Sequence, residues 1–475
     1  MTASAPYELV GGLETHVELA TKSKLFCGCS AAFGAEPNTH CCPVCLGLPG
    51  ALPRLNREAV RFAVLAGLAT NCRIRPVSYM DRKNYAYPDL PKGYQITQFD
   101  RPLCENGHLT LSNGRVIRIA RIHLEEDAGK LLHRQGKTFI DYNRAGVPLI
   151  EIVTEPDFRS AAEMREYLES IRLLMRHLGI SDGNMQEGSL RCDVNLSVRP
   201  LGASALGTRT EIKNLNSFSF LEKAVAYESE RQAALLALGG AVEQETRRFD
   251  EKTGTTKRMR DKEDADDYRY FREPDLPAVR LSDDEIEQLR ASLPELPAAR
   301  FARYTGAYGL SEADARLLVR HRPIADLFDE ASKGACPDTV ARLILGVVFQ
   351  KLGSEAARER EPLPVAADSL RELAVLSDSG RIRSGQVRIL LERMLDTGRA
   401  PADLLTELDA DKVDGDRLAA LCREVISAHP EAVRDIQNGK EKALKALIGC
   451  VMRNTKGGAD PRQAEALLRE MLKTR

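Results

Sequence analysis

Carboxylate and imidazole side chains recur on one face of several segments that have the two-residue period of β-strands. GLETHVEL (12–19) and RIHLEED (121–127) each gather three such groups, which are Glu14, His16 and Glu18 on the first and His123, Glu125 and Asp127 on the second. Glu151 stands between two isoleucines, and a carboxylate in an apolar strand is costly to bury unless something neutralises it. Taken jointly, these strands favour a cup that holds magnesium and nucleotide phosphates.

Cationic and aromatic side chains that could contact phosphates or bases lie nearby in the sequence. Two further strand-like segments, RCDVNLSVR (191–199) and TRTEIKNLNS (208–217), carry Arg191, Asp193 and Lys213 on their polar faces. A loop rich in Tyr, Lys and Pro (80–100) adds Lys83, Tyr85 and Lys92. Lysines can place point charges on phosphates and tyrosines can stack on a base.

A second interpretation is open for each strand taken alone. The polar face of a half-buried antiparallel sheet commonly points to solvent and has no chemical role. We expect this of Glu18 and Asp127. Lysines in loops are likewise usually just solvated, so the contacts expected of Lys83 and Lys92 rest on weak signals.

Four cysteines have the spacing of a zinc site. FCGC (26–29) and CCPVC (41–45) supply Cys27 and Cys29, then Cys42 and Cys45 after twelve intervening residues. Thiolates at these spacings suit tetrahedral zinc, and the two-residue gap forms a tight knuckle. Cys41 could replace Cys42, although the knuckle spacing prefers Cys42. A closed site with four thiolates stabilises a fold and performs no chemistry, so we predict a structural zinc ion.

The elements that position these residues fall into three predicted regions. Up to about residue 277 the pattern is mainly strands, interrupted by two helices that open at Ser160 with Glu163 and at Ser219 with Glu222. From 293 onward helical spacing takes over, and a last helix is expected to start at Asp460 and Pro461. We therefore predict a strand-rich domain that includes the zinc loop (1–292), a helical domain (293–405) and a helical tail domain (406–475).

Composition sets limits on location and partners. No apolar run is long enough to cross a bilayer and the N-terminus lacks a signal peptide, which predicts a cytoplasmic protein with no membrane contact. The formal net charge of −1 excludes a global basic field. From Arg434 to the end, however, ten Lys or Arg stand against five Asp or Glu, which weakly favours a tail that faces nucleic acid.

Several motifs are absent from the sequence. It contains neither a P-loop nor a dinucleotide-binding glycine motif, so any use of ATP must proceed without them. It also lacks the Ser-rich, Gly-rich segment of the amidases that hydrolyse glutamine. The sequence therefore shows no means of releasing ammonia from glutamine.

Long motifs in the sequence resemble the B-subunit family of tRNA-dependent amidotransferases. IDYNRAGVPLIEIVTEP (140–156) looks like the family signature, and GLETHVEL, YPDLPKGYQITQ, GSLRCDVNLSVR, EIKNLNSF and DYRYFREPDLP are also similar. The resemblance covers essentially the whole chain. Thr15 and Glu18 depart from the Val and frequent Gln of relatives, many of which also lack the four cysteines. The chain is too short for the insertion of the archaeal relative.

The resemblance implies an α+β fold: a cradle similar to glutamine synthetase, built on a mainly antiparallel sheet, followed by an all-α helical domain and a small all-α tail. It also implies a ligase that uses ATP and Mg²⁺ to phosphorylate the side-chain carboxylate of Glu-tRNA(Gln) or Asp-tRNA(Asn). Ammonia from the A subunit, an amidase, then displaces the phosphate, while the small C subunit ties the other two together.

This chemistry implies a role for each of the residues singled out above. The expected catalytic and Mg²⁺-binding residues are Glu14, His16, Glu125 and Glu151, with Asp193 as a possible further ligand. Contacts to nucleotide or substrate are expected from Lys83, Tyr85, Lys92, Arg191, Asp193 and Lys213. The tail is expected to contact tRNA through Lys440, Lys442 and Lys456. Two rival hypotheses are a tRNA-binding scaffold without catalysis and a free-standing ligase for a small amino acid, and the basic tail argues against the second.

Overall fold

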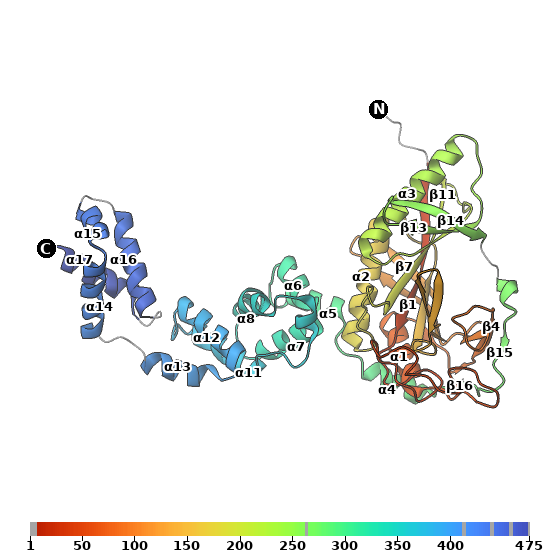
Figure 1. The fold of residues 1–475 in the computed structure, drawn as a ribbon, viewed down its shortest axis with the longest axis horizontal. Coiled ribbons are helices and arrows are strands. Elements are labelled where there is room, and N and C mark those ends of the chain that lie inside the picture. Colours follow the sequence, from red (N-terminus) through yellow and green to blue (C-terminus); the bar gives the residue numbers. More distant parts are fainter. Residues whose placement is uncertain (1–6, 262–264, 411–414, 438–440, 456–458, 474–475) are drawn as a thin grey trace. The chain divides into compact units, whose positions relative to one another are not determined.

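The computed structural model describes residues 7–261, 265–410, 415–437, 441–455 and 459–473. By contacts the chain divides into two compact units, Met1–Ala299 and Arg300–Arg475. The first unit contains a large sheet with helices and the second is helical (Figure 1). The predicted α+β class is therefore confirmed. The further division of the helical part after residue 405 stays a prediction.

A nine-stranded sheet forms the centre of the first unit, in the order β14-β13-β12-β11-β1-β10-β7-β6-β2. Neighbouring strands of this sheet are antiparallel except for β12 and β13, which are parallel. Its strands are β1 (Tyr7–Glu18), β2 (Arg73–Ile74), β6 (Cys104–Thr110), β7 (Val116–Glu126), β10 (Pro148–Thr154), β11 (Leu190–Pro200), β12 (Thr210–Lys213), β13 (Glu245–Asp250) and β14 (Thr255–Asp261).

Smaller strand groups surround this sheet. One sheet has the order β15-β4-β5, β16 pairs with β3, and β8 and β9 form a hairpin. These elements are β3 (Val77–Ser78), β4 (Asp81–Asn84), β5 (Tyr94–Thr97), β8 (Lys130–Arg134), β9 (Lys137–Asp141), β15 (Phe271–Arg272) and β16 (Val279–Arg280), with the 3₁₀ helix η1 (Ala265–Tyr268) before β15.

Helices α1 (Arg57–Ala69), α2 (Ala161–Leu178) and α3 (Phe218–Ala237) contribute to the same apolar core as the sheet, and α4 (Asp283–Ala291) packs on α1. The predicted start of α2 is confirmed, because the Ser160 side chain accepts from the Glu163 amide, and Gly179 ends the helix with φ of 68°. The predicted cap of α3 was wrong. Ser217 caps it, because its extended backbone directs its side chain to the Phe220 amide, and Ser219 lies within the first turn.

Strand alternation separates an apolar face of the sheet from a polar one. Leu13 and Val17 of β1, Leu124 of β7 and Ile150 of β10 belong to the core with the helices. Because successive side chains point to opposite faces, the residues between them lie on the other side of the sheet. That polar face carries the acidic and histidine residues singled out from the sequence.

The second unit is a succession of short helices. They are α5 (Pro297–Gly306, which begins in the first unit), α6 (Glu312–Val319), α7 (Arg322–Ala331), α8 (Pro337–Leu343), the π-helix η2 (Ile344–Val348), α9 (Phe349–Leu352), α10 (Glu355–Glu359), α11 (Ala367–Asp378), α12 (Ser384–Thr397), α13 (Pro401–Ala410), α14 (Gly415–Ala428), α15 (Pro430–Gln437), α16 (Glu441–Asn454) and α17 (Pro461–Lys473). The predicted start of the last helix is confirmed. Leu418, Cys422, Val425, Leu447 and Leu468 belong to one core cluster among the last helices. None of the described helices is long and apolar enough to cross a membrane.

Two buried tyrosines provide a matched test of packing. The hydroxyl of Tyr167 in α2 is buried and finds no hydrogen-bond partner among the described residues, whereas the hydroxyl of Tyr304 in α5 donates to Asp329 over 2.8 Å. We expect Tyr167→Phe to raise the free energy of unfolding by about 1 kcal/mol, because it removes an unpaired polar group, and Tyr304→Phe to lower it by a similar amount. Urea unfolding of the full chain checks both, and a larger loss in Tyr167→Phe would contradict this account.

Candidate active site and metal centre

Three adjacent strands bring one group of predicted residues together on the polar face. His16 of β1 is in register with Glu151 of β10, which is in register with His123 of β7. His16 Nε2 lies 3.3 Å from Glu125 Oε1 and 3.7 Å from Glu151 Oε2, and His123 Nε2 lies 3.3 Å from Glu151 Oε2. His16, Glu125 and Glu151 offer ligand atoms that lie within 4.8 Å of one another. We call these three residues the His16 group.

Charge within the His16 group is mutually compensated. Burial acts to lower the pKa of His16, but Glu125 and Glu151 raise it to about 9. Burial acts to raise the pKa of Glu151, but His123, His16 and Lys83 hold it well below its usual range. Both carboxylates are donors that a divalent cation could use, and a cation bound there would replace the proton of His16, because only a neutral imidazole binds metal.

Glu14 lies in a second group, which we call the Glu14 group, with Asp193 and Glu211. Their ligand oxygens also lie within 4.8 Å of one another, and Glu14 is in register with Asp193 across β1 and β11. Lys213 Nζ lies 2.6 Å from Asp193 and 3.2 Å from Glu211, while the Asn195 side chain donates to Glu14 over 2.8 Å. The structure therefore divides the four residues predicted as one magnesium site between two neighbouring groups.

The other predicted contacts are distributed unequally around these groups. Asp193 belongs to the Glu14 group and Lys213 contacts it. Although burial acts to lower the pKa of Lys213, Asp193 and Glu211 raise it. Lys83 is close enough to lower the pKa of Glu151, and the Tyr85 pKa is raised first by burial and then by Glu125. Arg191 is in register with His16. These side chains border the polar face.

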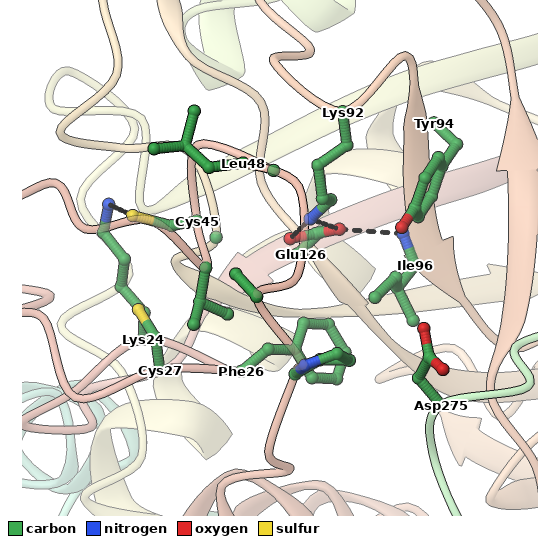
Figure 2. Close-up of a pocket in the computed structure, with 15 residues that line it drawn as sticks. Lys24, Phe26, Cys27, Cys45, Leu48, Lys92, Tyr94, Ile96, Glu126 and Asp275 are labelled. Atoms are coloured by element: carbon green, nitrogen blue, oxygen red, sulfur yellow. Dashed lines mark hydrogen bonds and ion pairs between the residues drawn. The ribbon is translucent and has the colours of Figure 1, made fainter.

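Lys92 is not brought to either group. Its ammonium pairs with Glu126, which alternates with Glu125 on β7 and so points to the opposite side of the strand. This pair lies in a cavity of about 200 Å³. Figure 2 shows the pair with Lys24, Phe26 and Cys45, which also line the cavity. The geometry does not support a contact between Lys92 and phosphates bound at the His16 group.

The expectation that Glu18 and Asp127 are solvated surface groups was wrong. Asp127 is 5% exposed and accepts from Arg191 over 2.7 Å, with Arg144 3.5 Å away. Burial and the neighbouring Asp127 raise the pKa of Glu18 to about 8. Burial and Asp127 therefore favour the neutral form of Glu18, which resembles the Gln expected in many relatives.

Two residues of the site were not assigned a role from the sequence. His123 contacts Glu151, and Glu211 completes the Glu14 group. Both stand at alternate positions on polar strand faces, so the signal was present in the pattern. The pattern does not give the order of the strands in the sheet, and this order decides which polar strand faces lie next to each other.

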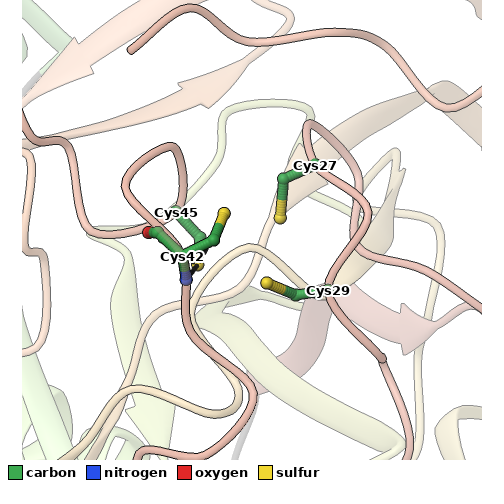
Figure 3. A group of neighbouring side chains, drawn as sticks. All are labelled: Cys27, Cys29, Cys42 and Cys45. Carbon is green, nitrogen blue, oxygen red and sulfur yellow. Dashed lines mark hydrogen bonds between the residues drawn. The ribbon is translucent and has the colours of Figure 1, made fainter. Parts of the chain in front are cut away.

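The four predicted zinc ligands come together in the loop after β1. Their sulfurs lie within 4.8 Å of one another, and Figure 3 shows Cys27 and Cys29 on one segment facing Cys42 and Cys45 on the other. Sulfurs around tetrahedral zinc lie about 3.8 Å apart, given bonds of about 2.3 Å. The Cys42 and Cys45 sulfurs are 3.9 Å apart, and the Cys42 amide donates to the Cys45 sulfur over 3.1 Å. The donor set and its spacing fit zinc.

A buried lysine adds to the electrostatics of the cysteine cluster. Lys24 is fully buried, and its ammonium lies 3.7 Å from the Cys45 sulfur and 3.2 Å from the Tyr142 carbonyl oxygen. The Cys27 thiol, the Cys42 amide and the charge of Lys24 hold the pKa of Cys45 well below its usual range, although burial opposes them. A thiolate is the form of cysteine that binds metal.

Only part of the predicted tRNA contact can be located. Lys442 is exposed on α16. Lys440 and Lys456 lie outside the described residues. Each of the three stays a prediction.

Comparison with known proteins gives matches along most of the chain. Residues 9–287 match the family described as the GatB/GatE catalytic domain, and residues 326–472 match the family described as the GatB domain. The chain belongs to the GatB/GatE family. The resemblance inferred from its motifs is thus confirmed.

Relatives in the GatB/GatE family match over nearly their full length. The aspartyl/glutamyl-tRNA(Asn/Gln) amidotransferase B subunit of Thermoanaerobacter sp. (strain X514) is 48% identical over 472 residues, covering 98% of this chain and 99% of the relative. The protein of the same name from Persephonella marina is 46% identical over 473 residues, covering 98% and 100%. As a member of this family, the chain is part of a glutamine-dependent amidotransferase, a ligase that forms a carbon–nitrogen bond.

Metal analysis tests the cysteine cluster. We expect the purified chain to hold about one equivalent of zinc, because four thiolates fill a tetrahedral site. Cys42→Ser should lose it and unfold at a lower temperature. Cys41→Ser is the matched control and should keep it, since Cys41 is the adjacent cysteine outside the cluster. Loss of zinc from Cys41→Ser with retention in Cys42→Ser would reverse the ligand assignment.

Proposed function

We propose that this chain is the subunit that activates the side-chain carboxylate of misacylated Glu-tRNA(Gln) or Asp-tRNA(Asn) by phosphorylation with ATP. The resulting acyl phosphate is then amidated to give Gln-tRNA(Gln) or Asn-tRNA(Asn). The observation that carries the proposal is the pair of adjoining carboxylate groups on one sheet face, bordered by lysine and arginine side chains. Phosphoryl transfer requires this combination because negative charge must be held in place and compensated.

The residues present fit magnesium. Five of the six donors are carboxylate oxygens, which are the ligands that magnesium prefers, and the sixth is the imidazole nitrogen of His16. Glu125, Glu151 and His16 would hold one ion, and Glu14, Asp193 and Glu211 are candidates for a second. Bound magnesium would spread the negative charge of the transferring phosphoryl group.

Side chains of the chain itself would orient the two substrates. Lys83 and Arg191 border the His16 group and Lys213 borders the Glu14 group, so each can contact phosphate or carboxylate oxygens. Arg191 is already paired with Asp127, and Lys213 with Asp193. These ion pairs fix the guanidinium and ammonium groups before a substrate arrives. Tyr85 beside Glu125 would contact the nucleotide or the aminoacyl end.

Other chains would supply the remaining functions. The relatives are named as the B subunit of an amidotransferase, which supports a multi-subunit enzyme. We propose that an amidase, the A subunit, releases ammonia from glutamine and that a small C subunit completes the complex. The zinc ion would stabilise the first unit, and the helical tail beyond residue 405 would contact the tRNA through Lys440, Lys442 and Lys456. A cytoplasmic location suits these partners.

The decisive experiment measures phosphate release from ATP by the reconstituted three-subunit enzyme with Glu-tRNA(Gln) and ammonium. We expect Glu125→Gln to lower the rate about 100-fold or more, because it removes a charge that holds magnesium at the phosphoryl group. Glu105→Gln is the matched control. Its carboxylate lies on the neighbouring strand β6 and pairs with Arg73 and Arg75, so its loss should leave the rate nearly unchanged.

The outcome also decides against the scaffold hypothesis. The catalytic role is supported if the Glu125→Gln enzyme binds tRNA and is as stable to unfolding as the wild type but releases no phosphate. Undiminished release that still depends on misacylated tRNA would make the chain a tRNA-binding scaffold and move the chemistry to one of its partners.

A further inference from the structure

A group of aromatic and cationic side chains, of which Phe99 and Arg272 are exposed, borders the His16 group. Phe99 and Tyr270 are stacked, with ring centroids 4.1 Å apart and planes 6° from parallel. The ring centroids of Tyr268 and Tyr270 are 6.0 Å apart, and the Lys83 ammonium lies 4.8 Å from the Tyr268 ring centroid. The Arg272 guanidinium lies 3.6 Å from the Tyr79 ring centre. We call these six residues the aromatic platform.

The platform is held by hydrogen bonds to β4. The Asn84 amide donates to the Tyr268 carbonyl over 3.3 Å, and the Phe99 backbone amide donates to Asp81 over 2.8 Å. The bidentate pair between Arg82 and Glu273, at 2.6 and 2.9 Å, fixes the strand that follows Tyr270. The aromatic rings are therefore placed before any ligand arrives.

The platform also adjoins the catalytic residues. Phe99 directly follows Gln98, whose side-chain oxygen accepts from the Leu124 backbone amide of β7 over 3.0 Å, and Glu125 is the next residue of that strand. Burial, and then the charges of Glu151 and Glu125, also raise the pKa of Tyr270. Lys83 of the platform acts on Glu151 by its charge. A group bound on the platform would therefore lie next to the carboxylates of the His16 group.

Exposure and charge indicate what would bind there. Phe99 is 49% exposed even though its ring is stacked on Tyr270. Exposed aromatic rings among lysine and arginine side chains are typical of surfaces that bind single-stranded nucleic acid, where bases stack and cations hold the phosphates.

We propose that the aromatic platform binds the unpaired 3′ end of the tRNA by stacking a base against Phe99. The inference rests on the proposed function, since the amino acid is joined directly to the terminal nucleotide. When its side-chain carboxylate reaches the His16 group, that nucleotide must lie within a few side-chain lengths. The platform occupies this position and has the chemistry that an unpaired base and its phosphate require.

The adenine of ATP is the other purine that could stack here, so the experiment uses two fluorescent probes. One is tRNA(Gln) with 2-aminopurine in place of its 3′-terminal adenine, and the other is 2-aminopurine riboside triphosphate. Stacking on an aromatic ring quenches 2-aminopurine fluorescence. Binding of each probe is measured by titration with the reconstituted three-subunit enzyme, without turnover.

In the wild type we expect quenching of the tRNA probe. Phe99→Ala should abolish most of it and weaken tRNA binding about tenfold, as is usual for loss of one base-stacking ring. Phe99→Trp should retain both. Phe139→Ala is the matched control, because Phe139 is 51% exposed on the β8–β9 hairpin and lies outside the platform. Phe99→Ala should leave the triphosphate probe unaffected.

Unchanged quenching and affinity of the tRNA probe in Phe99→Ala would overturn the inference. A loss of triphosphate quenching in that variant would also overturn it and would assign the platform to ATP. Because neither titration involves phosphoryl transfer, the tRNA probe should still be quenched by the Glu125→Gln enzyme. Failure of the platform is thereby distinguished from failure of the proposed chemistry.

Discussion

The register of β1 with its two neighbours is the constraint on which the polar face depends. His16 faces Glu151 on one side and Arg191 on the other, and Glu14 faces Asp193. A slip of one residue would turn every one of these side chains toward the helices. The apolar residues that flank Glu14 and His16 prevent it, since Leu13 and Val17 are almost fully buried. The charged geometry is thus specified by the hydrophobic face behind it.

Close packing behind β1 depends on a glycine. A Cβ atom on Gly11 would come within 2.2 Å of the Met164 methyl group of α2 and within 3.3 Å of the Asn195 carbonyl oxygen. The same glycine exchanges backbone hydrogen bonds of 3.1 Å with Phe158, which precedes that helix. A larger residue would force the Met164 side chain, which is fully buried in the core, to shift. The packing of α2 against the strand that carries Glu14 and His16 is therefore closest at this position.

Much of this arrangement could be predicted from the sequence, and the remainder has identifiable physical reasons. Alternation along each strand predicts which side chains share a face, and cysteine spacing predicts the cluster. Alternation does not give the order of strands, so it could not separate Glu14 from His16 or show that Asp127 is buried against Arg191. The pairing of Lys92 with Glu126 depends on a loop that packs against β7, for which no local signal exists. At α3, two serines two residues apart each offer a cap, and only the backbone conformation at Ser217 selects between them.

The loop that carries the four clustered cysteines is linked to the large sheet by a continuous set of contacts. Within it, the Asn38 amide donates to Asp141 over 3.0 Å and the His40 amide donates to Asn143 over 2.8 Å. The Leu25 amide, just before the first cysteines, donates to the Gly146 carbonyl over 2.8 Å. These contacts hold the chain directly before β10, the strand that carries Glu151. An isolated two-stranded hairpin such as β8–β9 is marginally stable in water, so it gives little support of its own. A metal that fixes four cysteines of the loop would therefore also limit the freedom of the segment that leads to Glu151. In this way a structural ion can affect the geometry of a site to which it contributes no ligand.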